Sequence, residues 1–281
     1  MAGNERLGGV IEPSVNPAGS KPDSGRDYLA PSVFQPESVL REARRQKGLP
    51  SVPVPDVCLL DPDGDVVRYA KESGRGSRHP GWACYHTEMW VIESEDIEIG
   101  VVGMAVGAPF AVLVAEQLAV SGAKLTISVT SAGRIAPVAE PPYFVLIDRA
   151  RRDEGTSDHY APPAEWSRLD PTLLRRLEGA FDSLDEPVVT GSAWTTDAPY
   201  RETAQALRQA EEWGVLCVEM EAAALYAYAA TRHRDVVCLA HITNTLAVDG
   251  DDFEKGAENG ALEALALTSL AARALRSRSG A

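Results

Sequence analysis

Long hydrophobic runs are absent from this sequence, and cysteines and aromatic residues are few. Its 281 residues include four cysteines, and aromatic residues make up 6% of the chain. No stretch approaches the roughly 20 consecutive apolar residues of a membrane-spanning helix. The first residues, MAGNERLGGVIEPS, lack the apolar segment of a signal peptide. We therefore expect a cytoplasmic protein that does not associate with membranes.

Positive charge is also scarce. Asp and Glu number 41 against 27 Lys and Arg, which gives a formal net charge of -14 and a pI of about 4.8. Nucleic-acid binding depends mainly on neutralising phosphates with Lys and Arg, so we expect no nucleic-acid partner. An acidic surface of this kind favours solubility.

The spacings that typify metal sites are missing as well. The five histidines show no H-x-H or i, i+4 pairing, and the cysteines show no C-x-x-C pair. We therefore expect no metal. Cys58, Cys217 and Cys238 lie in apolar runs, which is typical of reduced thiols in a protein core.

The chain does contain a regular alternation of strand and helix patterns. Residues 1–28 are rich in Gly, Pro, Ser and Asn without an apolar period, so we predict a mobile N-terminal tail followed by a single domain over 29–281. The alternation predicts an α/β three-layer sandwich, in which helices flank a mixed central β-sheet. Strands are predicted at 54–61, 89–94, 97–107, 124–135, 143–150, 187–197, 215–221 and 235–247. Helices are predicted at 36–48, 108–123, 170–184 and 201–214, directly after Glu221, and from about Asn259.

Polar residues gather where four of the predicted strands end. These ends are residues 128–133, 195–201, 219–221 and 243–245. Ligands of such sheets lie beyond the carboxyl ends of strands, and apolar strands need no polar residues of this kind in order to pack. Each end alone is compatible with turn chemistry, but the four together predict a polar pocket.

Five segments carry a family resemblance. GVLCVEMEAAALYAYA is a strand that ends in Glu-Met-Glu and leads into a helix, and VGMAVGAPFAVLVAEQLAVSGA is a Gly-rich turn followed by a helix. The others are VTSAGRIAP, RRDEGTSDHYAPP and TTDAPYRET. In this order, from about Val57 onward, they resemble the nucleoside phosphorylase superfamily and its uridine-phosphorylase-like branch. The resemblance implies a nucleoside phosphorylase-like fold that cleaves the bond between ribose C1′ and a base nitrogen.

The same resemblance assigns the ribose site to the Glu-Met-Glu segment. It implies that Glu221 accepts hydrogen bonds from the ribose 2′ and 3′ hydroxyls, and a nearby negative charge favours an oxocarbenium-like transition state. Met220 would pack on the ribose face. Glu219 would either line the pocket or point away from it. A structural salt bridge, or a charge at the helix N-terminus, is the alternative role for Glu221.

The base would lie near Asp197, Tyr200, Arg201, Glu202 and Asn244. The resemblance implies that Tyr200 stacks on the base and that Arg201 stabilises the leaving group. The segment TTDAPYRET does not reproduce the Gln-x-Arg spacing of uridine phosphorylases. Asp197 could therefore instead cap the start of the following helix. Asn244 stands near the place where purine-cleaving relatives often have an Asp, and an amide can donate a hydrogen bond but cannot act as a general acid. The sequence therefore favours a pyrimidine or an atypical base.

The phosphate site is where the sequence departs most from the family. By resemblance, arginines that bind phosphate are expected at three places. Ser128 and Thr87 stand at two of them, and the third, in LLDPDGDVVRYA, has no arginine at the matching position. A phosphate dianion without a cation is costly to bury. The residues predicted to hold phosphate or a water are Gly107, Ser128, Thr130, Ser131 and His86. Arginines elsewhere could replace the missing charge, and the candidates are Arg68, Arg75, Arg78 and Arg134.

Three functions therefore stay open. Phosphorolysis, with inorganic phosphate as co-substrate and no other cofactor, is slightly preferred because it is the usual reaction of the family. Hydrolysis by water, as in a nucleosidase, is the alternative that the missing arginines favour. A nucleoside-binding module without catalysis is the third. By resemblance we expect a small-molecule nucleoside as the partner and a homodimer or homohexamer, with His159 at a subunit contact.

Overall fold

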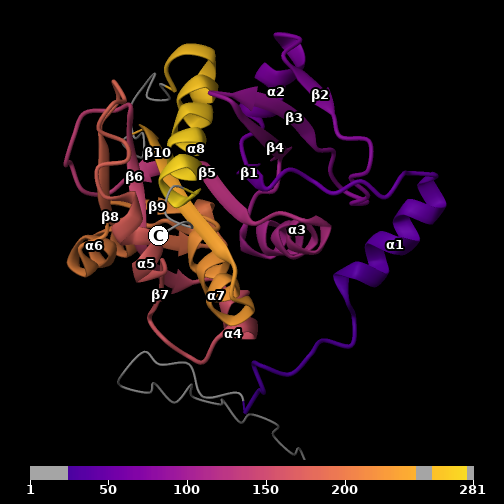
Figure 1. Cartoon of the computed structure of the whole chain (residues 1–281). Helices are drawn as coiled ribbons and strands as arrows, with labels where there is room; N and C mark the ends of the chain where they lie inside the picture. Colours follow the sequence, from indigo (N-terminus) through magenta and orange to yellow (C-terminus); the bar gives the residue numbers. More distant parts are fainter. Residues whose placement is uncertain (1–24, 245–254, 277–281) are drawn as a thin grey trace, which may run out of the picture.

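The computed structural model describes residues 25–244 and 255–276. In these ranges helices surround a mixed sheet (Figure 1). The strands are β1 Val57–Asp61, β2 Gly76–Arg78, β3 Trp90–Ser94, β4 Ile97–Gly103, β5 Leu125–Arg134, β6 Tyr143–Asp153, β7 Trp166–Arg168, β8 Val188–Thr196, β9 Cys217–Glu219 and β10 Asp235–Asn244. The helices are α1 Pro36–Lys47, α2 Asp65–Glu72, α3 Ala108–Ser121, α4 Ser157–Tyr160, α5 Pro171–Leu177, α6 Ala204–Trp213, α7 Ala222–Arg232 and α8 Ala261–Arg276, with 3-10 turns at Pro199–Arg201 and Ala257–Gly260. Most of the predicted tail, residues 1–24, lies outside the described residues.

The sheet closes on itself along part of its length. Its order is β10-β6-β8-β9-β5-β1-β4-β3-β2, and β10 also pairs with β5. The pairing is antiparallel between β10 and β6 and parallel between β10 and β5. Strands β5, β10, β6, β8 and β9 therefore form a closed ring of pairings, from which β1, β4, β3 and β2 extend. The predicted mixed sheet flanked by helices is confirmed, whereas the closed ring was not predicted.

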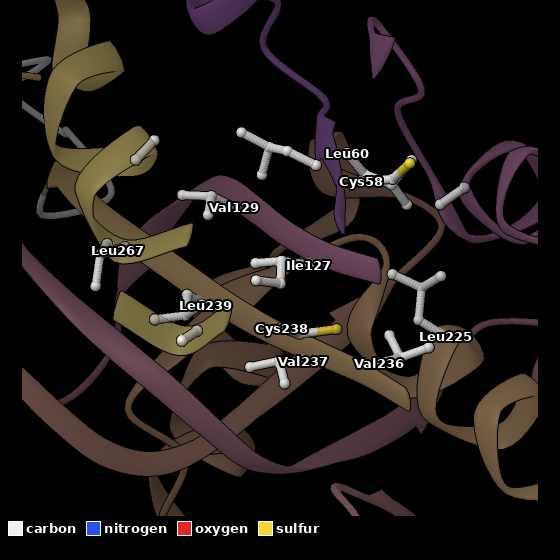
Figure 2. Close-up of a cluster of buried hydrophobic side chains, with 14 of the residues drawn as sticks. Cys58, Leu60, Ile127, Val129, Leu225, Val236, Val237, Cys238, Leu239 and Leu267 are labelled. Atoms are coloured by element: carbon white, nitrogen blue, oxygen red, sulfur yellow. The ribbon is translucent and has the colours of Figure 1, made fainter. Parts of the chain in front are cut away.

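The central strands are apolar because helices cover both of their faces. Helix α3 packs against α7 and α1, whereas α8 packs against α2 and α5. Figure 2 shows apolar side chains of β1, β5 and β10 together with Leu225 of α7 and Leu267 of α8. Strands buried on both faces are near-continuous apolar runs. Cys58, Cys217 and Cys238 are buried and free, as expected of reduced core thiols, and Cys84, for which no such expectation was made, is buried and free as well.

Several element boundaries differ from the predicted ones. Helix α5 begins, as predicted, after Asp170, whose carboxylate accepts from two backbone N–H groups, but it ends at Leu177. Helix α6 is capped by Thr203, so the alternative in which Asp197 caps this helix is wrong. Strand β9 ends at Glu219, which leaves Glu221 as the residue immediately before α7. No described helix is both long enough and apolar enough to span a bilayer.

Candidate active site

Glu219 ends β9 with its carboxylate surrounded by protein donors. Its Oε2 accepts from the backbone N–H of Glu221 at 2.6 Å and of Ala222 at 2.7 Å. Its Oε1 accepts from the hydroxyl of Thr195, whose oxygen also accepts from the N–H of Ala223 at 3.0 Å. The first N–H groups of a helix have no partner inside the helix, and Glu219 supplies one for α7. Glu219 therefore fixes the start of α7, and its contact with a sugar stays a prediction.

Glu221 is the least satisfied carboxylate of this junction. The residue is 1% exposed, and its Oε1 accepts from the backbone N–H of Gly107 at 2.7 Å. Its Oε2 is buried and has no hydrogen-bond partner in the part of the chain that the structure describes. Buried polar atoms are nearly always paired in native proteins. This oxygen is therefore available to a donor from a ligand.

Burial governs the charge of both glutamates. It raises the pKa of the Glu219 carboxyl above its ordinary value, and hydrogen bonds from Thr195, Glu221 and Ala222 oppose this. Burial also raises the pKa of Glu221, and the charge of Glu219 raises it further. The N–H of Gly107 and the nearby hydroxyl of Thr130 lower the pKa of Glu221 in part. Ionised Glu221 is thus unfavourable until another donor or a positive charge reaches it.

Gly107 is suited to its contact by its backbone conformation. Its φ is 86°, in a region that side chains with a Cβ rarely adopt, and it directly precedes α3. This turn directs its N–H toward Glu221, 114 residues away in the sequence. Gly107 was predicted to hold phosphate or water. In this structure its N–H is engaged by the carboxylate of Glu221.

The polar residues at the end of β5 have separate surroundings. Ser128 is 1% exposed, and its buried hydroxyl has no hydrogen-bond partner within the described ranges. Thr130 lies beside Glu221. Ser131 donates from its N–H, at 3.0 Å, and from its hydroxyl to Oδ2 of Asp63. Asp63 was not among the predicted site residues, and nothing in the local sequence signals this contact across 68 positions.

Four of the five residues predicted to bind the base, all except Asn244, lie in the loop after β8. Tyr200 is 99% exposed, and Arg201 is exposed in the same 3-10 turn. Asp197 accepts from the N–H of Gly155 at 3.0 Å. Glu202 is half-buried, and this burial raises the pKa of its carboxyl. The side chain of Asn244 lies outside the described residues, although its backbone ends β10. Contacts of these residues with a base stay predictions.

A cavity of about 1050 Å³ opens beside α1, α3, α4 and α7. Two of the predicted site residues, His86 and Asp197, line it together with His159. His86 is exposed and packs edge-on against Phe110, with ring centroids 6.2 Å apart. Glu221 is not among the lining residues of this cavity. No contact between His86 and Glu221 is seen among the described residues, so a role of His86 in holding phosphate or a water at the sugar stays a prediction.

The four arginines considered as substitutes for the phosphate-binding arginines all have protein partners. Arg68 pairs with Asp65 at 2.6 Å, and Arg78 pairs with Glu88 at 3.0 Å. Arg75 donates to the hydroxyl of Tyr69 and Arg134 to the carbonyl of Ala139. In these contacts none of them is directed at Ser128 or Ser131.

Comparison with known proteins agrees with this architecture. The profile of the family described as "Phosphorylase superfamily" matches residues 56–277. The chain belongs to the phosphorylase superfamily.

Two curated members of the superfamily are similar over part of their length. A guanosine phosphorylase of Halorubrum lacusprofundi is 26% identical over 47% of this chain and 55% of its own. A DeoD-type purine nucleoside phosphorylase of Exiguobacterium sibiricum is 28% identical over 53% of this chain and 64% of its own. The alignments thus span between half and two thirds of these relatives.

Solved superfamily structures show the same fold at lower identity. Purine nucleoside phosphorylase of Toxoplasma gondii has a TM-score of 0.67 and 17% identity, over 81% of this chain and 93% of the other. Uridine phosphorylase of Vibrio fischeri has a TM-score of 0.63 and 18% identity, over 83% and 94% respectively. The predicted superfamily and fold are therefore confirmed. Purine and uridine enzymes are both among the neighbours, so the base is not decided by them.

Proposed function

We propose that this protein is an enzyme that cleaves the N-ribosidic bond of a nucleoside, with Glu221 holding the ribose. One observation carries the proposal. Oε2 of Glu221 is a buried carboxylate oxygen that lacks a partner among the described residues. A buried acceptor without a donor costs about 1–3 kcal/mol. A ribose hydroxyl is a donor of the right kind, and membership of the superfamily supports a nucleoside as its source.

The arrangement favours the transition state over the substrate. As the C1′–N bond breaks, positive charge develops on the sugar, and an ionised Glu221 beside the ring stabilises that charge. The hydroxyl donors also favour the ionised carboxylate, which burial alone disfavours. Glu219 contributes by holding the backbone N–H groups on either side of the α7 start. Met220, next to Glu221, would cover the sugar.

The base is proposed to be a pyrimidine or an atypical base. Its support is Asn244, which cannot donate a proton to a purine as an Asp can, and Arg201, a cation suited to an anionic leaving group. Asp197, Tyr200 and Glu202 would complete the base site. A cytoplasmic homodimer or homohexamer belongs to the same proposal.

Base release from a panel of nucleosides tests the proposal. The panel contains uridine, thymidine, inosine, guanosine and adenosine, and release is followed by chromatography with phosphate present. We expect release from at least one pyrimidine nucleoside. Glu221→Gln should lower kcat/KM by roughly 30- to 1000-fold, equivalent to about 2–4 kcal/mol.

A matched control is available in α8. Glu263 also has a buried carboxylate oxygen without a described partner, and burial also raises its pKa. Glu263→Gln should leave kcat/KM unchanged. The proposal fails if Glu221→Gln releases base as fast as the control variant does, or if the wild-type protein neither cleaves nor binds any nucleoside of the panel.

A further inference from the structure

The end of β5 holds an anion that belongs to the chain itself. Oδ2 of Asp63 accepts both the N–H of Ser131, at 3.0 Å, and the hydroxyl of Ser131. A backbone N–H and a hydroxyl directed at one point form a site for an anionic oxygen. The carboxylate of Asp63 already occupies these two donors.

The charges around Asp63 disfavour a second anion. Lys255 lies 3.2 Å from Oδ2 of Asp63 and 2.7 Å from Oδ2 of Asp65. Arg68 pairs with the other oxygen of Asp65, and a third carboxylate, that of Asp61, ends β1 and is buried. Lys255 and Arg68 are thus already paired with Asp63 and Asp65, while burial raises the pKa of the Asp61 carboxyl to about 7. Among the described residues no such cluster is arranged to hold a metal ion. A phosphate dianion placed here would be repelled by the carboxylates of Asp63 and Asp65, and Lys255 and Arg68 are already paired with them.

The face of β5 that adjoins Glu221 offers neutral groups only. Side chains alternate along a strand, so those of Ser128 and Thr130 share one face and that of Ser131 lies on the other, while the N–H of Ser131 lies in the plane of the sheet next to Thr130. Thr130 lies beside Glu221. The hydroxyl of Ser128 and Oε2 of Glu221 are buried without partners in the described ranges. Unpaired polar atoms of this kind are the usual partners of a buried water.

We propose that Asp63 takes the place of phosphate at the Ser131 donors, so that this enzyme transfers the ribosyl group to water. The inference rests on the proposed function and specifies its acceptor. The water oxygen forms a bond to C1′, and the C1′–N bond breaks with its electron pair left on the base nitrogen. The proton that water gives up ends on that nitrogen. The products are a free sugar and a neutral base, without a sugar phosphate.

Product analysis of the wild-type protein tests the acceptor directly. The protein is freed of phosphate and mixed with a nucleoside that it cleaves, in water labelled with heavy oxygen. We expect the label at C1′ of free ribose and a rate that added phosphate does not raise. A sugar 1-phosphate as product, or a rate that requires phosphate, would overturn the inference and leave the proposed N-ribosidic cleavage intact.

Phosphate binding gives a second measurement that needs no substrate. Titration calorimetry with inorganic phosphate should show no binding to the wild-type protein. Asp63→Ala frees the Ser131 donors and removes one negative charge, so this variant should bind phosphate measurably. The control is Asp56→Ala, which removes a carboxylate that pairs with Lys124 at the surface and should not create binding.

The two measurements separate the possible failures. Phosphate binding by the wild-type protein contradicts the inference. If Asp63→Ala does not fold, the wild-type titration and the labelled product decide alone. If no nucleoside is cleaved, the proposed function fails, while the absence of phosphate binding to wild type, together with its appearance in Asp63→Ala, still supports Asp63 as the resident anion.

Discussion

Two carboxylate clusters at the ends of strands differ in what balances their charge. At the end of β9, Glu219 and Glu221 contact neutral N–H and hydroxyl donors, and one oxygen of Glu221 is left over. At the end of β1, Asp63 and Asp65 are paired with Lys255. The first cluster therefore has a carboxylate oxygen without a hydrogen-bond partner among the described residues, whereas both aspartates of the second cluster are paired. A ligand with hydroxyl donors suits the first, and the second leaves no place for an anion.

The largest expected loss of stability comes from removing Glu219, the carboxylate of the first cluster whose hydrogen bonds are complete. Glu219→Ala removes the acceptor of two backbone N–H groups and of the Thr195 hydroxyl, all buried. Each buried donor left unpaired costs about 1–3 kcal/mol. Since removal of a buried charge offsets part of this, we expect the free energy of unfolding to fall by roughly 3 kcal/mol in urea titrations at neutral pH. A loss below about 1 kcal/mol would show that Glu219 does not hold the start of α7.

The two clusters also differ in how far the sequence predicts them. Glu219 and Glu221 lie in one segment, and their position between an apolar strand and an alanine-rich helix predicts a site at a strand end. The polar end of β5 was predicted for the same reason. The structure does place these residues at strand ends, because strand periodicity and the order of the elements are local properties of the chain, while their role in a site stays a prediction.

The second cluster has no local signal. Asp63 meets Ser131 across 68 positions, and Lys255 meets Asp65 across 190. The segment around Asp63 has no arginine in register for a phosphate, and nothing in it predicts a contact between its aspartates and Ser131 or Lys255. Likewise the closed ring depends on the pairing of β10 with β5, which lies far away in the sequence. Contacts of this kind follow from the register of the whole sheet, so a single sequence does not predict them.

The titration of His241, a histidine close to the second cluster, tests the charges of that cluster. His241 stacks on Phe144 with ring centroids 4.3 Å apart. Burial, followed by the charge of Lys255, lowers the pKa of His241 to about 4, and Asp63 and Asp65 oppose this. An unfolded histidine has a pKa of about 6.5. The stability from neutral His241 is therefore present above roughly pH 6.5 and is lost as the pH falls toward about 4.

We expect this loss to reach about 2–3 kcal/mol between roughly pH 7 and pH 4. Buried carboxyls with raised pKa values, such as Asp61, change stability in the opposite direction over this range. The measurement is therefore a difference between proteins, in which urea titrations of wild type and His241→Gln are compared at each pH. Parallel pH profiles of the two proteins would contradict the assigned pKa.

A smaller change of stability with pH, opposite in sign to that of His241, is expected from Glu221 in the first cluster. Because the pKa of Glu221 is raised, the folded protein binds a proton that the unfolded chain releases above about pH 4.5. Stability from this group therefore falls as the pH rises toward the raised pKa. Glu221→Gln removes the titration and keeps an acceptor for Gly107. We expect it to stabilise the fold by about 1 kcal/mol at neutral pH while activity is lost.

Urea titration of Glu221→Gln at neutral and at mildly acidic pH measures this gain. The gain should shrink as the pH falls, because wild-type Glu221 and its unfolded counterpart then both carry the proton. Glu219→Ala, in contrast, should destabilise at both pH values. Equal destabilisation by the two substitutions would mean that Glu221 is as fully satisfied as Glu219, and the contrast between the clusters would disappear.

The smallest expected effect links Lys255 to His241. Lys255 is the cation that lies between Asp63 and Asp65, and its charge lowers the pKa of His241. Lys255→Gln should therefore raise the pKa of His241 toward its ordinary value, since the two aspartates then act on it unopposed. An NMR titration of the imidazole ring protons measures the shift, with Lys124→Gln, a surface lysine paired with Asp56, as the control. If the two variants titrate alike, Lys255 does not balance the carboxylates at the end of β1.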